Sequence, residues 1–328
     1  MESRAACEAR GKLRMRRFVL KRAGLALVTL FLVSVILFAI AQVLPGDVGR
    51  AILGPYATNQ QVVALDHQLG VDRPLLIRYW SWASGFVTGR WGTSYLMDRP
   101  VLPLVMQRLA NSLILGGFAL ALIAPFSIAI GVLAALRAGR WFDRLAAIVG
   151  LSLIALPEFA SGIVVLVIFA VALGWLPVSS HVPGPDPLDW FRQLLLPSIP
   201  LMFVLFGYIS RMARAGTVEA LHANYTRTAV LKGLSRRAVI WTHVLRNSLL
   251  PTITVIGVQT GYLVGGLVVT ETIFNYPGIG KLIFDSAIGH DLPVLQAAVL
   301  LIAILYMALM LVTDIIYTLL NPRIRLSV

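Results

Sequence analysis

Six long, largely apolar stretches follow one another along the chain, separated by polar segments. A helix needs roughly 20 mostly apolar residues to cross a bilayer. The third stretch is interrupted by Pro157 and Glu158, and the fourth is short and contains Pro197 and Pro200. The pattern predicts an all-α integral membrane protein with six transmembrane helices, over residues 23–44, 109–136, 145–176, 194–210, 248–270 and 292–320.

The composition supports a lipid environment. Of the 328 residues, 58% are hydrophobic and only 13% are charged, whereas soluble domains have about a quarter of their residues charged. The net charge of +13 could suggest nucleic-acid binding, but no nucleic-acid motif accompanies the basic residues, so we expect no nucleic-acid partner. A single cysteine, Cys7, excludes an internal disulfide and a cysteine-based zinc site.

The basic residues predict the orientation of the chain. Twenty of the 28 lysine and arginine residues lie in four segments, residues 1–22, 137–144, 211–246 and 323–325. With six spans, all four segments fall on one side of the membrane, and basic loops mark the cytoplasmic side. We therefore expect a multi-pass protein of the bacterial or archaeal inner (plasma) membrane with both termini in the cytoplasm.

The N-terminus allows two interpretations. The first apolar stretch exceeds the roughly 7–15 apolar residues of a signal peptide, so an uncleaved helix is expected over residues 18–44, with a cleaved signal peptide as the alternative. Either Met1 or Met15 can be the true start. Residues 1–17 form a cytoplasmic extension, of which residues 1–14 are expected to be disordered.

Two loops are too long to be simple connections. Residues 45–108 contain turn signals and apolar-aromatic runs and are expected to form a small external domain of short helices. Residues 211–247 are strongly basic, and their apolar spacing predicts one or two amphipathic helices on the cytoplasmic side with a break at Gly233. The five helices of residues 109–320 then form one core, followed by a cytoplasmic tail, residues 321–328.

The sequence contains no recognisable nucleotide-binding, metal-binding or catalytic motif. The fragment Gly278-Ile279-Gly280-Lys281 lacks the first glycine and the final Ser or Thr of a phosphate-binding loop. The histidines form no H-E-x-x-H pair, and no nucleophile elbow is present. We therefore expect no catalytic residue, no metal site and no cofactor in this chain.

Ionisable residues inside membrane spans are candidates for function. Glu158, next to the helix-breaking Pro157, is a carboxylate that lines a pathway, one that is paired inside the subunit interface, or one in a loop closer to the membrane surface. The sequence leaves these alternatives open. Asp314 is expected to pair with a nearby basic residue. Gly261 and Gly265 belong to a four-residue spacing of small residues in the fifth span, together with Gly257, and such spacing allows close helix packing.

The basic loop carries the most specific pattern in the chain. It resembles the cytoplasmic signature of ABC importer permeases in the dipeptide/oligopeptide/nickel branch, which reads D-Y-x-R-T-A-R-A-K-G-L-S and then H-x-L-R-N-x-L-x-P. Three positions depart from it, namely Asn224, Val230 and Leu231. The matching or adjoining residues expected to dock on an ATPase are Glu219, Ala220, Tyr225, Arg227, Thr228, Ala229, Lys232, Gly233 and Leu234.

The resemblance covers nearly the whole chain from Arg16 onward. Further family elements occur in the family order, with Val48 in place of the usual second proline of a Pro-Gly-Asp-Pro element. They include Pro45-Gly46-Asp47, Leu69-Gly70-Val71-Asp72-Arg73-Pro74, Gly174-Trp175-Leu176-Pro177, Tyr276-Pro277-Gly278-Ile279-Gly280 and Asn321-Pro322-Arg323. Glu158 does not belong to this pattern, so its role stays open.

The resemblance implies a type I ABC importer permease fold and a set of partners. These are a second homologous permease, two ABC ATPase subunits that bind ATP and Mg²⁺, and an extracytoplasmic solute-binding protein. A short coupling helix within residues 220–234 would transmit the action of the ATPase. The implied solutes are di- or oligopeptides, with nickel complexes, glutathione, sugars or opines as alternatives.

Two other classes remain as rivals. A secondary transporter driven by an ion gradient often has inverted repeats and paired broken helices, but the sequence predicts only one break, at Pro157. A membrane-embedded enzyme would need a set of catalytic or metal-binding groups facing one cavity, and no such set is evident.

Overall fold

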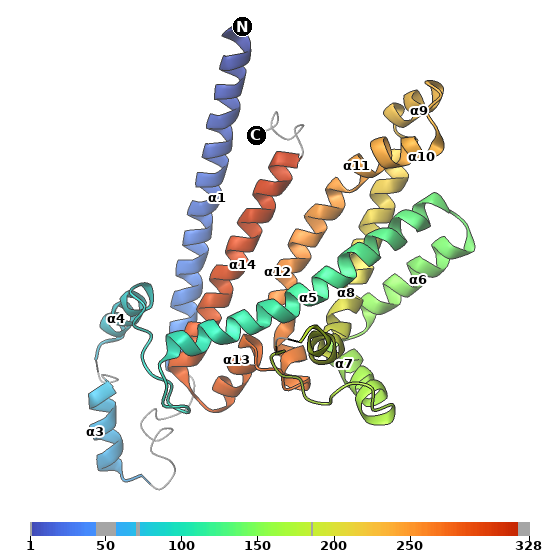
Figure 1. Ribbon diagram of the computed structural model, residues 1–328. Coiled ribbons are helices and arrows are strands. Elements are labelled where there is room, and N and C mark those ends of the chain that lie inside the picture. Colours follow the sequence, from blue (N-terminus) through green and yellow to red (C-terminus); the bar gives the residue numbers. More distant parts are fainter. Residues whose placement is uncertain (1, 44–56, 70–72, 185, 321–328) are drawn as a thin grey trace. The chain divides into compact units, whose positions relative to one another are not determined.

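The computed structural model describes residues 2–43, 57–69, 73–184 and 186–320, and these ranges are predominantly helical (Figure 1). This confirms the all-α prediction. The helices are α1 (Glu2–Val43), α3 (Asn59–Leu69), α4 (Leu75–Val87), α5 (Val101–Leu136), α6 (Trp141–Ala155), α7 (Glu158–Leu166), η1 (Val167–Ala172), α8 (Pro187–His222), α9 (Asn224–Leu231), α10 (Arg236–Ala238), η2 (Val239–Val244), α11 (Leu245–Ser248), α12 (Leu250–Ile273), α13 (Ile279–Ile288) and α14 (Leu292–Leu320).

At least four of the described helices are long and apolar enough to cross a membrane. They contain the segments Val19–Ala41, Val101–Leu136, Pro187–His222 and Leu292–Ile316. Two further candidates are bent pairs: α6 with α7 and η1, at an angle of 100°, and the two parts of α12, at 54°. The predicted break at Pro157 is therefore confirmed.

Three predicted boundaries were wrong. The expected disorder of residues 1–14 is contradicted, since α1 begins at Glu2 and runs without a break into the apolar stretch. The second apolar helix begins at Val101 instead of residue 109, and the fourth, predicted over residues 194–210, extends over Pro187–His222. The physical reason is the same for all three helices, because charged residues end an apolar stretch without ending a helix.

The described residues divide into two compact units, each with its own core. One unit comprises Met1–Arg22, Leu113–Tyr276 and Ala308–Val328 and is called here the α8 unit. The other comprises Ala23–Ser112 and Pro277–Met307 and is called the α13 unit. The division passes through α1, α5 and α14, so each of these helices contributes one part to each unit.

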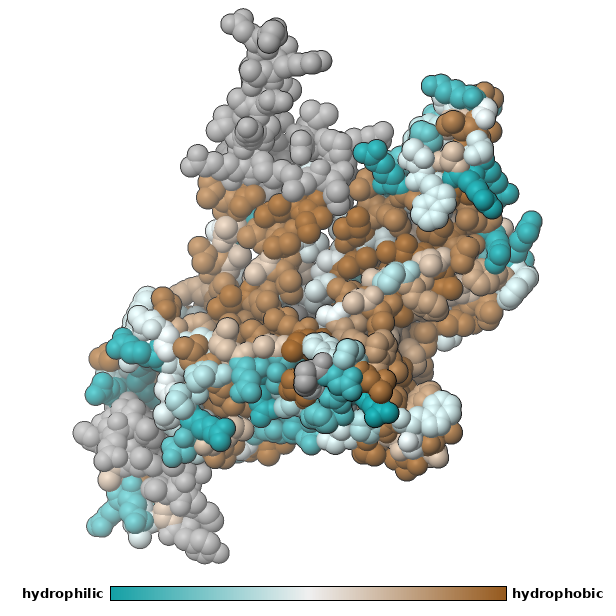
Figure 2. Space-filling model, in the orientation of Figure 1, coloured by the Kyte–Doolittle hydropathy of each residue, from teal (hydrophilic) through white to brown (hydrophobic). Residues whose placement is uncertain are grey.

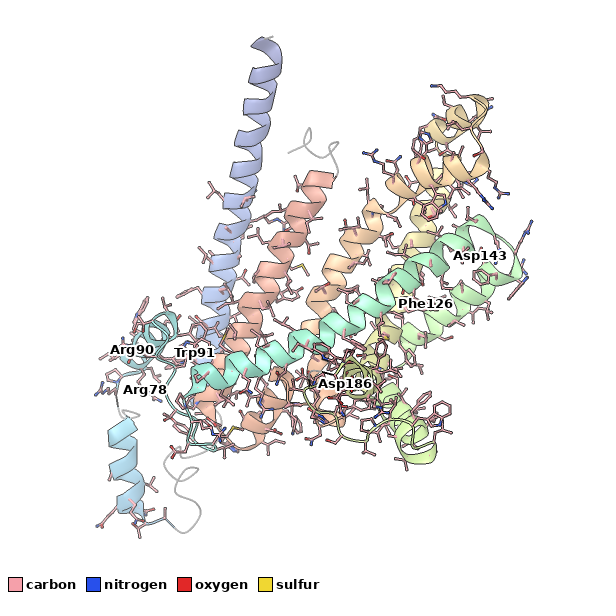
Figure 3. The ribbon with its side chains drawn as sticks, viewed as in Figure 1. Arg78, Arg90, Trp91, Phe126, Asp143 and Asp186 are labelled. Carbon is pink, nitrogen blue, oxygen red and sulfur yellow. The ribbon has the colours of Figure 1, made fainter. Side chains whose placement is uncertain are left out.

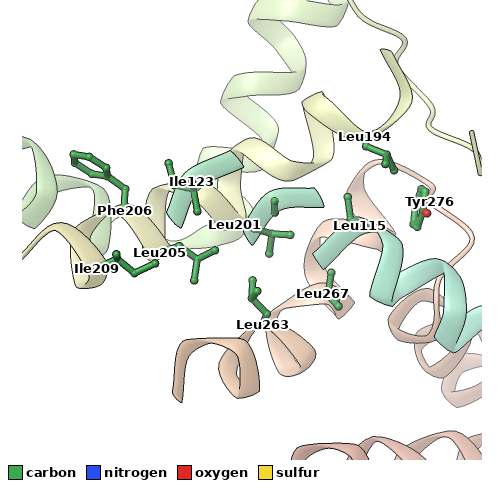
Figure 4. Close-up of a cluster of buried hydrophobic side chains, with 11 residues drawn as sticks. Leu115, Ile123, Leu194, Leu201, Leu205, Phe206, Ile209, Leu263, Leu267 and Tyr276 are labelled. Carbon is green, nitrogen blue, oxygen red and sulfur yellow. The ribbon is translucent and has the colours of Figure 1, made fainter. Parts of the chain in front are cut away.

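Helix α8 is the centre of the α8 unit and packs against α6, α7, α11 and α12. At the crossing with α6, a Cβ on Gly207 would collide with Ile154 and the backbone of Gly150, so only glycine permits this close approach. Figure 4 shows the main apolar cluster of this unit. Its fully buried members come from α5, α8, α12 and the turn after α12, and they include Leu115, Ile123, Leu201, Leu205, Ile209, Leu263, Leu267 and Tyr276.

The outer surface of the α8 unit is apolar where a water-soluble protein would be polar. Figure 2 shows hydrophobic residues over α5, α6 and α8, and polar residues gathered around α9 and α10. Phe126 on α5 and Ile148 on α6 are exposed by 56% and 62% (Figure 3). Such a surface is stable only against lipid or a protein partner, in agreement with a membrane-spanning unit.

The α13 unit has a second apolar cluster and several polar contacts between distant residues. Val101, Val105 and Leu109 of α5 pack with Ile279 and Leu282 of α13 and Val294, Ala297 and Ala298 of α14. The Asn111 side chain donates to the carbonyl of Pro277 (2.8 Å), and the Ser112 hydroxyl accepts from the Ile279 backbone N–H (2.8 Å). Short helices α3 and α4 precede this cluster in the chain, so the predicted short helices of residues 45–108 are present in the described part of that range.

Candidate functional sites

The first candidate site is the α9 segment, residues 219–235, which contains all nine residues predicted to dock on an ATPase. Helix α9 follows the end of α8 after a single extended residue, Ala223. The predicted short helix within residues 220–234 is therefore present.

The base of the α9 segment is held by a small apolar cluster and a buried hydrogen bond. Ala220 at the end of α8 and Ala229 of α9 are buried together with Val239 and Val244 of η2. The buried hydroxyl of Thr226 donates to the carbonyl of Ala220 at 2.7 Å. These contacts attach the base of α9 to the end of α8.

The end of α9 is set by glycine. Gly233 has φ +79°, a left-handed conformation that other residues adopt only with strain. Its N–H donates to the carbonyl of Val230 (2.9 Å), and the N–H of Leu234 donates to the carbonyl of Ala229 (3.4 Å). The Ser235 hydroxyl then accepts from the Ala238 N–H and begins α10. The predicted break at Gly233 is confirmed.

The outer face of the α9 segment mixes cations with exposed apolar side chains. Among the predicted residues, Glu219, Tyr225, Arg227, Thr228, Lys232 and Leu234 are exposed. The sequence interpretation missed Val230 and Leu231 on this face and Trp241 of the nearby η2, although they are exposed by 58%, 79% and 73%. Two of these three are positions at which the chain departs from the family signature, and that departure was the signal that could have identified them.

The second candidate site lies at the break between α6 and α7. Helix α6 ends at Ala155, and Leu156 and Pro157 are extended, with ψ of 123° and 135°. An extended residue before proline is expected, because the proline ring clashes with a helical conformation there. Glu158 is the first residue of α7, where the positive end of the helix dipole favours a carboxylate.

A cavity of about 250 Å³ opens at this break and is enclosed by α6, α7, α8 and α12. Its polar lining consists of Glu158, Tyr208 of α8, and Gln259 and Tyr262 of α12; Ile154, Ala155, Leu156, Pro157 and Val204 complete it. Within the described residues no lysine, arginine or histidine lines this cavity, and none forms an ion pair with Glu158. We call this cavity the Glu158 pocket.

Two contacts position the Glu158 carboxylate against α12. The Thr270 hydroxyl donates to Oε1 at 2.7 Å. Gly266 leaves room for the other oxygen, since a Cβ there would lie 2.9 Å from Oε2. Gln259 is 8% exposed, and its Nε2 has no hydrogen-bond partner in the described part of the chain. The pocket therefore offers an acceptor and a separate donor.

The small residues of α12 have different surroundings from one another. Gly257 closely approaches Thr313 of α14, as expected for small residues in a helix contact. Gly261 is buried, whereas Gly265 is exposed and has nothing within 4 Å of a potential Cβ. In this run of small residues, Gly266 is the glycine that closely approaches Glu158.

Two arginine–aspartate ion pairs lie within the described residues of the α8 unit. Asp314 pairs with Arg22 at 2.9 Å, as predicted. Asp143, in the first turn of α6, accepts a bidentate pair of hydrogen bonds from Arg214 of α8. The sequence analysis did not find this second pair, because the two residues are 71 positions apart.

Two family profiles cover most of the chain. Residues 127–326 match the profile described as "Binding-protein-dependent transport system inner membrane component". Residues 15–116 match the N-terminal profile of the corresponding membrane components.

Individual relatives agree with these profiles. The "Glutathione transport system permease protein GsiC" of Escherichia coli (strain K12) is 38% identical over 311 residues, covering 95% of this chain and 99% of the relative. The "Probable peptide ABC transporter permease protein y4tP" of Sinorhizobium fredii is 36% identical over 309 residues, covering 94% and 99%. A solved structure of the MetNI methionine ABC transporter in an inward-facing conformation matches 69% of this chain and 100% of its own, with a TM-score of 0.53 and 18% identity, a likeness of fold alone.

Proposed function

The chain belongs to the family of binding-protein-dependent transport system inner membrane components, and we propose that it forms half of the translocation pathway of an importer for di- or oligopeptides. Such a protein is the permease of an ABC importer and not an enzyme. The peptide assignment is supported by the 36% identity to a relative named as a peptide transporter permease.

Glutathione is the second candidate solute. The relatives that carry this name are 38% identical over nearly their whole length. Glutathione is itself a small peptide, so both candidates share an amide backbone and a free amino group. Nickel complexes, sugars and opines remain the family's other solutes, and no residue of the two candidate sites favours them.

The arrangement of subunits is part of the proposal, and membership of the family supports it. We assign to the complex a second homologous permease, two ATPase subunits that bind ATP and Mg²⁺, and an extracytoplasmic binding protein that delivers the solute. We assign six spans to this chain, with α9 and both termini on the cytoplasmic side and residues 45–108 outside. The distribution of basic residues supports this orientation.

The observation that carries the coupling role is the construction of the α9 segment. It is a short helix attached by buried contacts at its base, ended by Gly233, and exposed on an apolar and cationic face. A helix of this kind suits a cleft in an ATPase subunit, because Leu231 and Trp241 would lose their exposure to water on docking.

A single substitution tests this role. We expect Gly233→Val to leave the protein in the membrane but to abolish solute-dependent ATP hydrolysis by the reconstituted complex. A β-branched residue in the left-handed conformation costs about 1–2 kcal/mol or more, so α9 would end differently. The measurement is ATPase activity with and without the solute-loaded binding protein.

Gly174→Val is the matched control for this substitution. Gly174 also has a positive φ, of +62°, and nothing lies within 4 Å of its potential Cβ. It follows η1, far along the chain from α9. We expect this variant to keep solute-dependent hydrolysis. Normal transport by Gly233→Val, or an equal loss in both variants, would contradict the coupling role.

Subunit composition is tested by gentle extraction of a C-terminally tagged chain and mass spectrometry of the proteins that copurify with it. A second permease and one or two ATPase chains are expected. A monodisperse protein without an ATPase, under conditions that preserve a known importer, would contradict the proposal.

A further inference from the structure

The Glu158 pocket combines features that a structural carboxylate does not need. Burying a charge inside a membrane protein is unfavourable unless the charge is paired or functional. Within the described residues, Glu158 receives one neutral hydrogen bond, from Thr270, and no cation. Its carboxylate instead borders a cavity. A cation from outside this chain would complete the site.

The rest of the pocket matches the groups that accompany a cationic amine in a peptide. The Nε2 of Gln259 is a buried donor without a partner in the described part of the chain, and it suits a carbonyl oxygen. Tyr208 and Tyr262 add aromatic rings and hydroxyl groups, and aromatic rings attract cations through their faces. Carboxylate, amide donor and tyrosines together resemble a site for an ammonium group next to a carbonyl.

The volume of the pocket limits what can enter. About 250 Å³ is below the ~300–1,000 Å³ of pockets that enclose whole drug-sized ligands. The pocket is therefore large enough for the amino end of a peptide, and a longer peptide would extend beyond it. A pocket that binds one end of a peptide does not contact the side chains further along it. Such a pocket accepts peptides of varied sequence.

The location of the pocket connects it with helix movement. It is enclosed by both sides of the 100° break and by α8 and α12. A change of the angle between α6 and α7 changes the separation of Glu158 from Gln259, which belong to different elements. A group bound between them consequently favours one angle of the break.

We propose that the Glu158 pocket binds the protonated amino group and the adjacent carbonyl of the transported solute, so that this permease selects for solutes with a free amine. This inference rests on the proposed function as an importer. Glu158 accepts the N–H donors of the ammonium, and Gln259 Nε2 donates to the carbonyl oxygen.

The direct test uses the purified complex without its binding protein, so that the binding protein's own selectivity does not enter. Equilibrium dialysis measures binding of a radiolabelled dipeptide amide and of its N-acetyl form. We expect the free-amine form to bind about tenfold or more tightly, because a charge-assisted hydrogen bond is lost on acetylation. Glu158→Gln should abolish this difference, and Glu158→Asp should retain part of it. Equal binding of both forms, or binding of neither at millimolar concentration, would overturn the proposal.

Transport provides the second test. Glu158→Gln is expected to reduce uptake of an amine-bearing peptide about tenfold in proteoliposomes containing the full complex and the loaded binding protein. Gly266→Ala should reduce uptake by a smaller factor, because its new Cβ displaces Oε2. The control is Asp285→Asn, the same change at a 41% exposed carboxylate that pairs with Lys281 on α13. Wild-type uptake by Glu158→Gln would overturn the pocket's role.

Failure of the pocket's role and failure of the proposed function give different results. If Glu158→Gln causes the partner permease to dissociate during purification, Glu158 pairs across the subunit interface and the pocket's role fails. If the wild-type complex itself imports no peptide, the proposed function fails, and the dialysis experiment still decides whether the pocket binds amines.

Discussion

Two carboxylates of neighbouring helices, Asp143 of α6 and Glu158 of α7, have opposite surroundings. Each lies in the first turn of its helix, α6 or α7. Asp143 is 5% exposed, and Arg214 and the backbone N–H of Gly139 complete its hydrogen bonds. Glu158 accepts a hydrogen bond from the Thr270 hydroxyl, forms no ion pair within the described residues, and borders a cavity.

The difference shows how to distinguish structural from functional charge in a membrane protein. A buried carboxylate with a bidentate arginine is satisfied within the chain, so its removal damages the fold. A carboxylate that faces a cavity without a cation is available for a ligand, so its removal should affect the fold little. The comparison therefore makes separate predictions for stability and for transport.

The largest effect on stability is expected for substitution of Asp143, the carboxylate that pairs with Arg214. Asp143→Ala leaves Arg214 without its partner, and breaking a buried pair costs about 3–5 kcal/mol. Because the Arg214 side chain is 38% exposed, water compensates in part, and we expect about 2–4 kcal/mol. Thermal denaturation of the detergent-purified protein measures this loss.

The double variant Asp143→Ala/Arg214→Ala is the matched control. It should lose less stability than the sum of the two single variants, because neither charge is left alone. If the stability losses of the two single variants simply added up in the double variant, the ion pair would not stabilise the fold. The comparison of Asp143 with Glu158 would then lose its basis.

An intermediate effect, on transport, is expected when a cationic side chain is placed beside Glu158. Gln259→Lys places an ammonium beside Glu158 and makes the pocket similar to the Asp143 site. We expect a loss of peptide uptake of about tenfold, since the lysine occupies the position assigned to the solute's amine. Gln259→Met, which fills the same space without charge, should cause a smaller loss of uptake. Equal uptake by the lysine variant and the wild type would contradict this prediction.

The smallest effect on stability is expected for Glu158→Gln. The amide oxygen can still accept from Thr270, and no cation within the described residues loses a partner. The stability should therefore change by less than about 1 kcal/mol, in the same denaturation assay as for Asp143→Ala. A loss as large as that of Asp143→Ala would indicate that Glu158 is structural as well.

Sequence patterns located most of the helices and both candidate sites, but for different reasons. The apolar stretches and Pro157 indicated membrane-spanning helices and their main break. The signature around Tyr225 and Gly233 indicated the α9 segment, because a left-handed glycine and a short helix depend on local sequence. The ends of α1, α5 and α8 were wrong, since a helix continues through charged residues wherever its backbone hydrogen bonds remain satisfied.

The chain alone therefore determines the lipid environment, the helical class, the transport family and the α9 segment, all of which depend on composition or on neighbouring residues. Only the tertiary structure decides which charges are paired. Asp143 meets Arg214 across 71 positions, and Glu158 meets Thr270 across 112. Whether a carboxylate faces an arginine or a cavity depends on how α6, α7, α8 and α12 pack, and no local pattern encodes that packing.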